Sequence, residues 1–237
     1  SVEPTEGAKL EEKPQIAQEI RELDSAEKVY GELITTAKNV YDNVETSRIA
    51  FLPIITAIRK VIAVLVAGNN ELVAFCECST PELYLYSHAA NVCILSTLIG
   101  ISMNYGPVEL EKLALSALLH DIGMLRVIDI ANKPEKISSD EFKAIKEHPN
   151  VSELISHIEL TGEQKQLLET VISQVHERMD GNGYPKEISG ENINIFARII
   201  SIADVYEALT HKRSWRDRYL PHEALKKMIE IADSEFD

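Results

Sequence analysis

The chain has 237 residues, 45% of them hydrophobic, which is enough to bury the core of one large domain or two small ones. Its net charge of −14 and isoelectric point of about 5.0 argue against a binder of nucleic-acid polymers, because such surfaces need positive charge. The same charge argues against binding to anionic membranes. An anionic ligand must therefore find its positive charge locally.

The cysteines and the apolar runs indicate a cytoplasmic protein. Cys76, Cys78 and Cys93 are an odd set without repeating spacing, which is typical of reduced thiols, although Cys76 and Cys78 as a C-x-C pair offer an alternative metal site. The longest apolar run, residues 61–67, is far shorter than the roughly 20 residues that span a bilayer. No secretory signal is present. Because the chain opens on serine and stops at "DSEFD", we expect it to be part of a longer protein.

The first 79 residues carry no obvious chemistry. Residues 1–24 contain ten charges and little apolar periodicity, which predicts a linker or lead-in helix. Ser25 is a suitable N-cap for a helix whose apolar face includes Val29, Leu33 and Val40, and a second helix is expected at about 49–66. We expect residues 25–79 to form an N-terminal helical layer or dimer surface that is dispensable for ligand chemistry.

Helix signals continue through the rest of the chain. Thr80 and Pro81 predict a helix that runs to about residue 104, and Pro107 predicts the start of the next. Two capping-box patterns follow, at Ser138 with Glu141 and at Thr161 with Gln164. No strand-like alternation lasts more than a few residues. The sequence therefore predicts an all-α fold of eight or nine helices, with an irregular loop at "DGNGYPKEISGEN".

Histidines and aspartates continue several of the predicted apolar faces. His88, Asp121, His176 and Asp204 each extend such a face, on four predicted helices. A buried carboxylate without a partner costs several kcal/mol, so converging groups of this kind favour a divalent cation between them. The alternative for any one histidine is a core residue that is hydrogen-bonded to a carbonyl. His157, His211 and His222 lack such a setting, and we interpret them as solvated or locally hydrogen-bonded.

Five spaced motifs resemble a known family. His88, the His120-Asp121 doublet and Asp204 occur in the order of the metal-dependent HD phosphohydrolase superfamily, and "HDIG", "EHP", "HERMDGNGYP" and "IADVYEALT" resemble its HD-GYP branch. The resemblance assigns residues 80–237 to an HD-GYP-like domain, which we expect to be C-terminally truncated. It implies a multi-helix HD-domain bundle, hydrolysis of cyclic di-GMP and one to two divalent ions, Fe or Mn. The positions that match its metal ligands are His88, His120, Asp121, His148, His176 and Asp204.

The resemblance also implies roles for particular residues. His120 would bind one ion and Asp121 would bridge two, which makes this doublet the catalytic pair. A ligand set of nitrogen and oxygen without thiolate favours Fe or Mn, and a water between two such ions becomes acidic enough to attack phosphorus. Tyr184, Arg213 and Arg216 are candidate substrate contacts, although the basic run is also typical of a solvated face. The loop 183–185 is a candidate surface for a signalling-protein partner.

Three departures from the family pattern keep other functions open. Met124 stands where most members have lysine, Val175 stands where most have a second histidine, and Tyr84 stands where a third-metal glutamate would lie. A third ion is therefore not expected. One alternative function is a degenerate HD-GYP module that binds a nucleotide or partner without turnover. Another is a general nucleotide phosphohydrolase, because the doublet alone does not fix the substrate.

Overall fold

The predicted all-α class is confirmed, with more helices than expected. The computed structural model describes residues 25–76, 83–131, 133, 135–211 and 217–236, which contain eleven α-helices and no strand. The two or three additional helices reflect short elements of four or five residues, such as α4, α7 and α9, which are too short to show a periodic pattern. The α-helices are α2 (Ala26–Asn43), α3 (Phe51–Val66), α4 (Glu71–Phe75), α5 (Tyr84–Ser102), α6 (Pro107–Leu119), α7 (Ile128–Ala131), α8 (Ser139–Ile145), α9 (Ser152–Ser156), α10 (Gly162–Ile172), α11 (Ile195–Thr210) and α12 (Pro221–Glu235). The 3₁₀ helices are η2 (Ile122–Arg126) and η3 (Gly190–Asn192).

Three of the predicted capping residues begin helices as expected. The Ser25 hydroxyl accepts a hydrogen bond from the backbone N–H of Lys28 at the start of α2. Both capping boxes are formed, at the starts of α8 and α10. The helix predicted from Thr80 begins at Tyr84 and ends at Ser102, and Thr80 itself lies outside the described residues.

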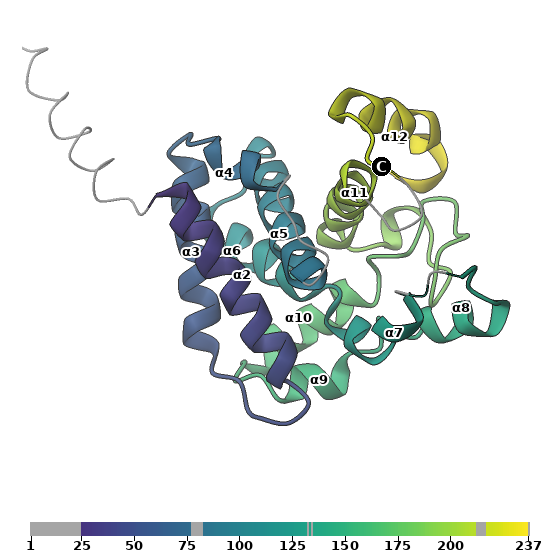
Figure 1. Cartoon of the computed structure of the whole chain (residues 1–237), viewed down its shortest axis with the longest axis horizontal. Coiled ribbons are helices and arrows are strands. Elements are labelled where there is room, and N and C mark those ends of the chain that lie inside the picture. Colours follow the sequence, from purple (N-terminus) through teal and green to yellow (C-terminus); the bar gives the residue numbers. More distant parts are fainter. Residues whose placement is uncertain (1–24, 77–82, 132, 134, 212–216, 237) are drawn as a thin grey trace, which may run out of the picture.

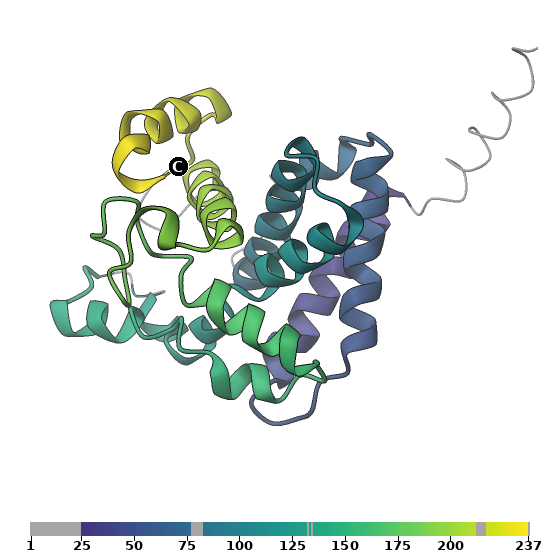
Figure 2. The ribbon, with the colours of Figure 1, turned by 180° about the vertical axis from the view of Figure 1, so that it is seen from behind.

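Helix α5 is the central helix of the molecule. It packs against α2, α6 and α11, so that α2 and α3 lie on one side of it and α11 and α12 on the other (Figures 1 and 2). By length and composition α5 could also cross a membrane, but most of it is buried inside the protein, together with the polar side chains of His88 and Asn91. We therefore interpret α5 as a core helix.

The N-terminal helices share one hydrophobic core with the residues after 80. Buried side chains such as Leu33 of α2 and Ile58 of α3 belong to the same cluster as Leu113 of α6 and Ile200 of α11. Burial of this apolar surface is the main force that holds the helices together. The expected N-terminal layer therefore packs directly behind the helices that carry the site.

Candidate metal centre

The six predicted ligand residues converge at one end of α5. His88 and Asp204 lie on α5 and α11, whereas the other four lie just beyond helix ends. The sequence prediction was wrong in placing Asp121 and His176 on helices, because α6 ends at Leu119 and α10 ends at Ile172. Asp121 is at the centre of the cluster. Its carboxylate oxygens lie 3.5 Å from Nε2 of His88, 3.6 Å from Nε2 of His120, 3.4 Å from Nε2 of His148 and 3.9 Å from Nε2 of His176.

These residues form two groups that could each hold an ion. His88, His120 and Asp121 form one group, and Asp121, His148 and His176 form the other; within each group the ligand atoms lie within 4.8 Å of one another. Asp121 belongs to both groups. Asp204 lies beside the first, with Oδ1 3.3 Å from Nε2 of His88.

Three of the histidine rings are each held by a hydrogen bond from Nδ1, so that Nε2 points into the cluster. Nδ1 of His88 donates to the Glu207 carboxylate at 2.7 Å, Nδ1 of His120 donates to the Ala117 carbonyl at 2.8 Å, and Nδ1 of His148 donates to the Ile145 carbonyl at 2.7 Å. Because Nδ1 carries the proton in each ring, Nε2 faces the cluster with a free lone pair in the neutral form. Metal-binding histidines are held in this way.

The arrangement of polar atoms fits divalent ions. Nε2 of His120 is buried without a hydrogen-bond partner, although buried polar atoms are normally paired. Nε2 of His148 and Nε2 of His176 face each other at 2.9 Å. A cation that accepts lone pairs from these nitrogens and from Asp121 would satisfy all of them. Of the alternative C-x-C pair, Cys76 is buried and Cys78 lies outside the described residues.

The charged groups of the cluster shift one another's pKa values. Burial disfavours the charged carboxylate of Asp121, but His120, His148 and His88 hold its pKa well below the usual range. Burial likewise disfavours the imidazolium of His88, yet Glu207 and the neighbouring acids raise its pKa well above the usual range. The pKa of His176 is lowered to about 4 by burial and by His148. Protonation of His88 on Nε2 would therefore compete with ion binding at that nitrogen.

Gly123 allows the doublet to lie against His148. A Cβ atom at this position would overlap the carbonyl oxygen of His148 and lie 2.9 Å from its carbonyl carbon. Only glycine permits so close an approach of two backbone segments. The glycine of "HDIG" therefore brings the two ligand groups together.

The loop after His176 is built around that ligand. The Tyr184 ring stacks on the His176 ring with centroids 5.0 Å apart and an angle of 11°, and the Tyr184 N–H donates to the His176 carbonyl at 3.0 Å. A Cβ atom at Gly183 would lie 2.5 Å from backbone atoms of residues 176–178. The buried carboxylate of Glu177 accepts backbone N–H groups of Lys186 and Ile188 at 2.7 Å and 3.0 Å. One face of Tyr184 thus covers a candidate ligand.

Glu207 is a site residue that the sequence analysis missed. Its side chain is only 1% exposed, and besides His88 it accepts a hydrogen bond from Nδ2 of Asn91 at 3.1 Å. Nδ1 of His211 donates to the Glu207 backbone carbonyl at 3.2 Å and lies 3.1 Å from Oε1 of its carboxylate. Burial disfavours its charge, but His88 and the other donors lower its pKa. His211 is thus locally bonded as predicted, and it is buried rather than solvated. The signal was the spacing of Asp204 and Glu207 on one face of α11, with His211 just after the last residue of that helix.

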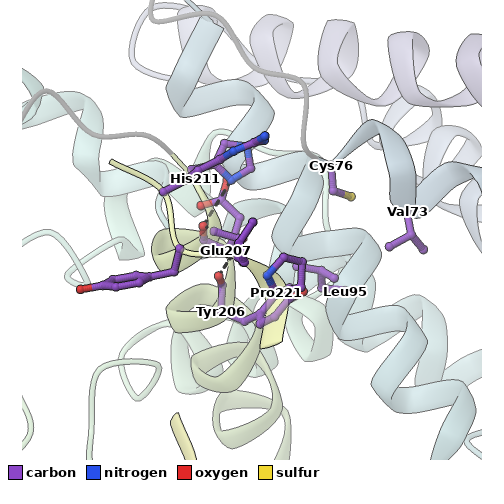
Figure 3. Close-up of a pocket in the computed structure, with 11 residues that line it drawn as sticks. Val73, Cys76, Leu95, Tyr206, Glu207, His211 and Pro221 are labelled. Atoms are coloured by element: carbon purple, nitrogen blue, oxygen red, sulfur yellow. Dashed lines mark hydrogen bonds and ion pairs between the residues drawn. The ribbon is translucent and has the colours of Figure 1, made fainter. Parts of the chain in front are cut away.

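A cavity of about 90 Å³ lies behind Glu207, between α4 and α5 on one side and α11 and the start of α12 on the other (Figure 3). Leu95, Tyr206 and Pro221 contribute to its largely apolar wall, and Glu207 and His211 contribute polar groups. Glu207 therefore separates this cavity from His88.

The structure also describes the three residues that depart from the family pattern, Tyr84, Val175 and Met124. The Tyr84 hydroxyl lies 3.5 Å from both Nδ1 of His88 and Oε2 of Glu207. Val175 is buried in the hydrophobic core. Met124 is half-buried on η2.

A cation lies near the cluster just after the end of α8. Nζ of Lys146 is 5.2 Å from the centre of the Tyr184 ring and 5.1 Å from that of Phe142, which are cation–π distances. The predicted substrate contacts Arg213 and Arg216 lie outside the described residues.

Comparisons with known proteins place the chain in a family. The model of the HD domain family matches residues 80–237. The chain is 32% identical over 163 residues to the cyclic di-GMP phosphodiesterase PA4108 of Pseudomonas aeruginosa, which covers 68% of this chain and 39% of that protein. It is 33% identical over 134 residues to the 3'3'-cGAMP-specific phosphodiesterase 3 of Vibrio cholerae, over 56% of this chain and 28% of that protein.

The chain thus spans about two fifths or less of these curated relatives. Among solved structures, Bd1817, a HDG"Y"P protein from Bdellovibrio bacteriovorus, has the same fold, with a TM-score of 0.71 and 20% identity over 90% of this chain and 67% of that one. The chain therefore belongs to the HD domain family, in its HD-GYP branch.

Proposed function

We propose that the chain is a metal-dependent phosphodiesterase that hydrolyses cyclic di-GMP or a closely related cyclic dinucleotide. The observation that carries this proposal is the pair of ion-binding groups that share Asp121. The similarity to proteins named cyclic di-GMP and cGAMP phosphodiesterases supports the same reaction class. At about 30% identity, the choice between these substrates belongs to the proposal.

The protein's own residues would hold and orient the reacting groups. His88, His120, His148 and His176 present Nε2 atoms, and Asp121 and Asp204 present carboxylates, as a set of nitrogen and oxygen ligands that suits one or two Fe or Mn ions. When bound, such ions would supply an acidified water as nucleophile and neutralise charge on the phosphate. Asp121 and His120 would be the catalytic pair, because Asp121 lies between both groups and His120 Nε2 is buried beside it.

Positive charge for the substrate would come from outside the ligand set. We place the nucleotide against Tyr184 and Lys146, because Lys146 brings an ammonium group to the ring that covers His176. Arg213 and Arg216 remain proposed phosphate contacts. The proposal includes a cytoplasmic location, a homodimer, and a signalling-protein partner at the loop 183–185.

A second function is favoured by specific residues. Met124 supplies no cation, and the buried Val175 supplies no second imidazole beside His176. These features fit a module that binds a nucleotide or a partner with little turnover.

Metal content and cleavage, measured together, test the proposal. Anaerobically purified protein is loaded with Mn²⁺, its metal is counted by elemental analysis, and cyclic di-GMP cleavage is followed by chromatography. We expect one to two ions per chain and cleavage that is lost in His120→Ala and Asp121→Ala, whereas His222→Ala on α12 serves as the matched control and behaves like wild type. Protein that stays metal-free with added Mn²⁺ or Fe²⁺ contradicts the proposal. Metal-loaded protein that binds the nucleotide without cleaving it supports the second function.

A further inference from the structure

The first helix of the described chain, α2, is hydrogen-bonded to the helix that carries the candidate ligand His88. Tyr30 lies in the second turn of α2, before the residues that the HD domain model matches, and only 7% of it is exposed. Its hydroxyl donates to Oδ1 of Asn91 at 2.8 Å. Asn91 lies on α5, three residues after His88, and is fully buried. A residue outside the matched family domain is thus bonded directly to the helix that carries a candidate ligand.

The Asn91 amide has its hydrogen-bonding groups fixed on both sides. Its nitrogen donates to Oε1 of Glu207 at 3.1 Å and to the backbone carbonyl of Cys76 at 3.2 Å, while its oxygen accepts from Tyr30. Because the amide has two N–H donors and both are engaged, the oxygen must face Tyr30. Loss of the Tyr30 hydroxyl would leave this buried oxygen without its donor and remove the restraint on the amide.

The chain of hydrogen bonds ends at a candidate ligand. Glu207 accepts from Asn91 through Oε1 and from Nδ1 of His88 through Oε2 at 2.7 Å. The Tyr30–Asn91–Glu207–His88 chain is therefore continuous, and each member is at least nine-tenths buried. Chains of hydrogen bonds in a buried environment reinforce one another.

We propose that Tyr30 is a positioning residue for the metal centre, through which helix α2 sets the metal affinity of the group formed by His88, His120 and Asp121. A displacement of α2 that lengthens the Tyr30–Asn91 bond loosens Glu207 and with it the ring orientation of His88. The N-terminal layer then regulates ion occupancy rather than being dispensable for it. This inference rests on the proposed metal-dependent function.

Tyr30→Phe tests the relay with little change in packing, because the ring and its stacking on Phe75 are retained. Tyr86→Phe is the matched control: it also removes a tyrosine hydrogen bond between α5 and α2, from Tyr86 to Asp42 on the protein surface, but that bond does not lead to Glu207. Mn²⁺ affinity is measured by calorimetry, and the melting temperature of the metal-free protein is measured by circular dichroism. Asn91→Leu is the second variant, which removes the middle of the chain.

Removal of an outer hydrogen-bond partner typically weakens metal binding about tenfold to a hundredfold, and we expect the lower end for Tyr30→Phe because it acts two bonds away from His88. Tyr86→Phe should bind Mn²⁺ like wild type. In a Glu207→Gln background, Tyr30→Phe should have no further effect on affinity, because the two residues act in series. If Tyr30→Phe fails to fold, Asn91→Leu decides the question by the same affinity measurement.

Three results overturn the inference. These are wild-type affinity in Tyr30→Phe, equal losses in Tyr30→Phe and Tyr86→Phe, and a full additional loss in the Glu207→Gln background. If any of them occurs while wild type binds ions and cleaves cyclic di-GMP, the inference fails and the proposed function stands. Wild-type protein that binds neither Mn²⁺ nor Fe²⁺ overturns both.

Discussion

Replacement of Glu207 by glutamine should weaken the metal centre without changing the shape of the side chain. The two Glu207 oxygens accept hydrogen bonds from Nδ1 of His88 at 2.7 Å and from Nδ2 of Asn91 at 3.1 Å, and Nδ1 of His211 lies 3.1 Å from Oε1. Glutamine has one acceptor oxygen and places an NH₂ group towards at least one of these donors. The variant therefore loses the charge of the acceptor and leaves a buried donor unpaired.

The size of the effect follows from these contacts. A hydrogen bond to a charged group contributes about 1.5–3 kcal/mol, so the metal-free Glu207→Gln protein should lose roughly that free energy of unfolding. His88 should lose its fixed orientation, and Mn²⁺ binding should weaken about tenfold to a hundredfold. Calorimetric titration with Mn²⁺ and denaturant unfolding of the metal-free protein measure the two effects separately. Unchanged Mn²⁺ affinity together with reduced stability would refute the reasoning and leave Glu207 as a purely structural residue.

Three further predictions concern the glycine turn, the cation and pH. Gly123→Ala should fold but lose most Mn²⁺, because the added Cβ pushes the doublet from the His148 backbone; retention of wild-type metal content by elemental analysis would contradict this. Lys146→Met should raise KM for cyclic di-GMP by about tenfold, which corresponds to about 1.4 kcal/mol, and should leave the metal content unchanged. The exposed control Lys143→Met should keep the wild-type KM, and equal KM values for Lys146→Met and wild type would exclude Lys146 as a substrate contact. Protons compete with ions at His88 and His148, whose pKa values are raised, so Mn²⁺ affinity should increase as pH rises from 6 to 8, and a pH-independent affinity would contradict this competition. The metal-free protein should lose the stability that charged His88 contributes as pH rises through the pKa of His88 in the folded state.

Local signals in the sequence predicted much of the fold. The N-cap Ser25 and the capping boxes at Ser138 and Thr161 begin helices in the structure, because these side chains satisfy backbone N–H groups within a few residues. The exact ends of helices were harder to predict. Asp121 and His176 continue an apolar period by sequence, yet both lie beyond the last helical turn, because periodicity does not record where hydrogen bonding stops.

The outer residues of the site depend on contacts between distant segments. The match to family motifs identified the candidate ligands, and the structure brings them together. Glu207 was missed because a single glutamate on a helix is usually a solvated side chain, and its sequence neighbours do not show that it is buried. The bond from Tyr30 to Asn91 joins residues 61 positions apart and leaves no local pattern. Such links follow from how α2 packs on α5, which the sequence analysis treated as packing alone.

Anomalous diffraction from crystals soaked in Mn²⁺ tests the central claim most directly, because it locates each ion independently of activity. The account predicts two peaks with Asp121 between them, one bounded by His88 and His120 and the other by His148 and His176. The absence of any peak at these residues, in crystals that contain Mn²⁺ elsewhere, would contradict a shared-carboxylate metal centre.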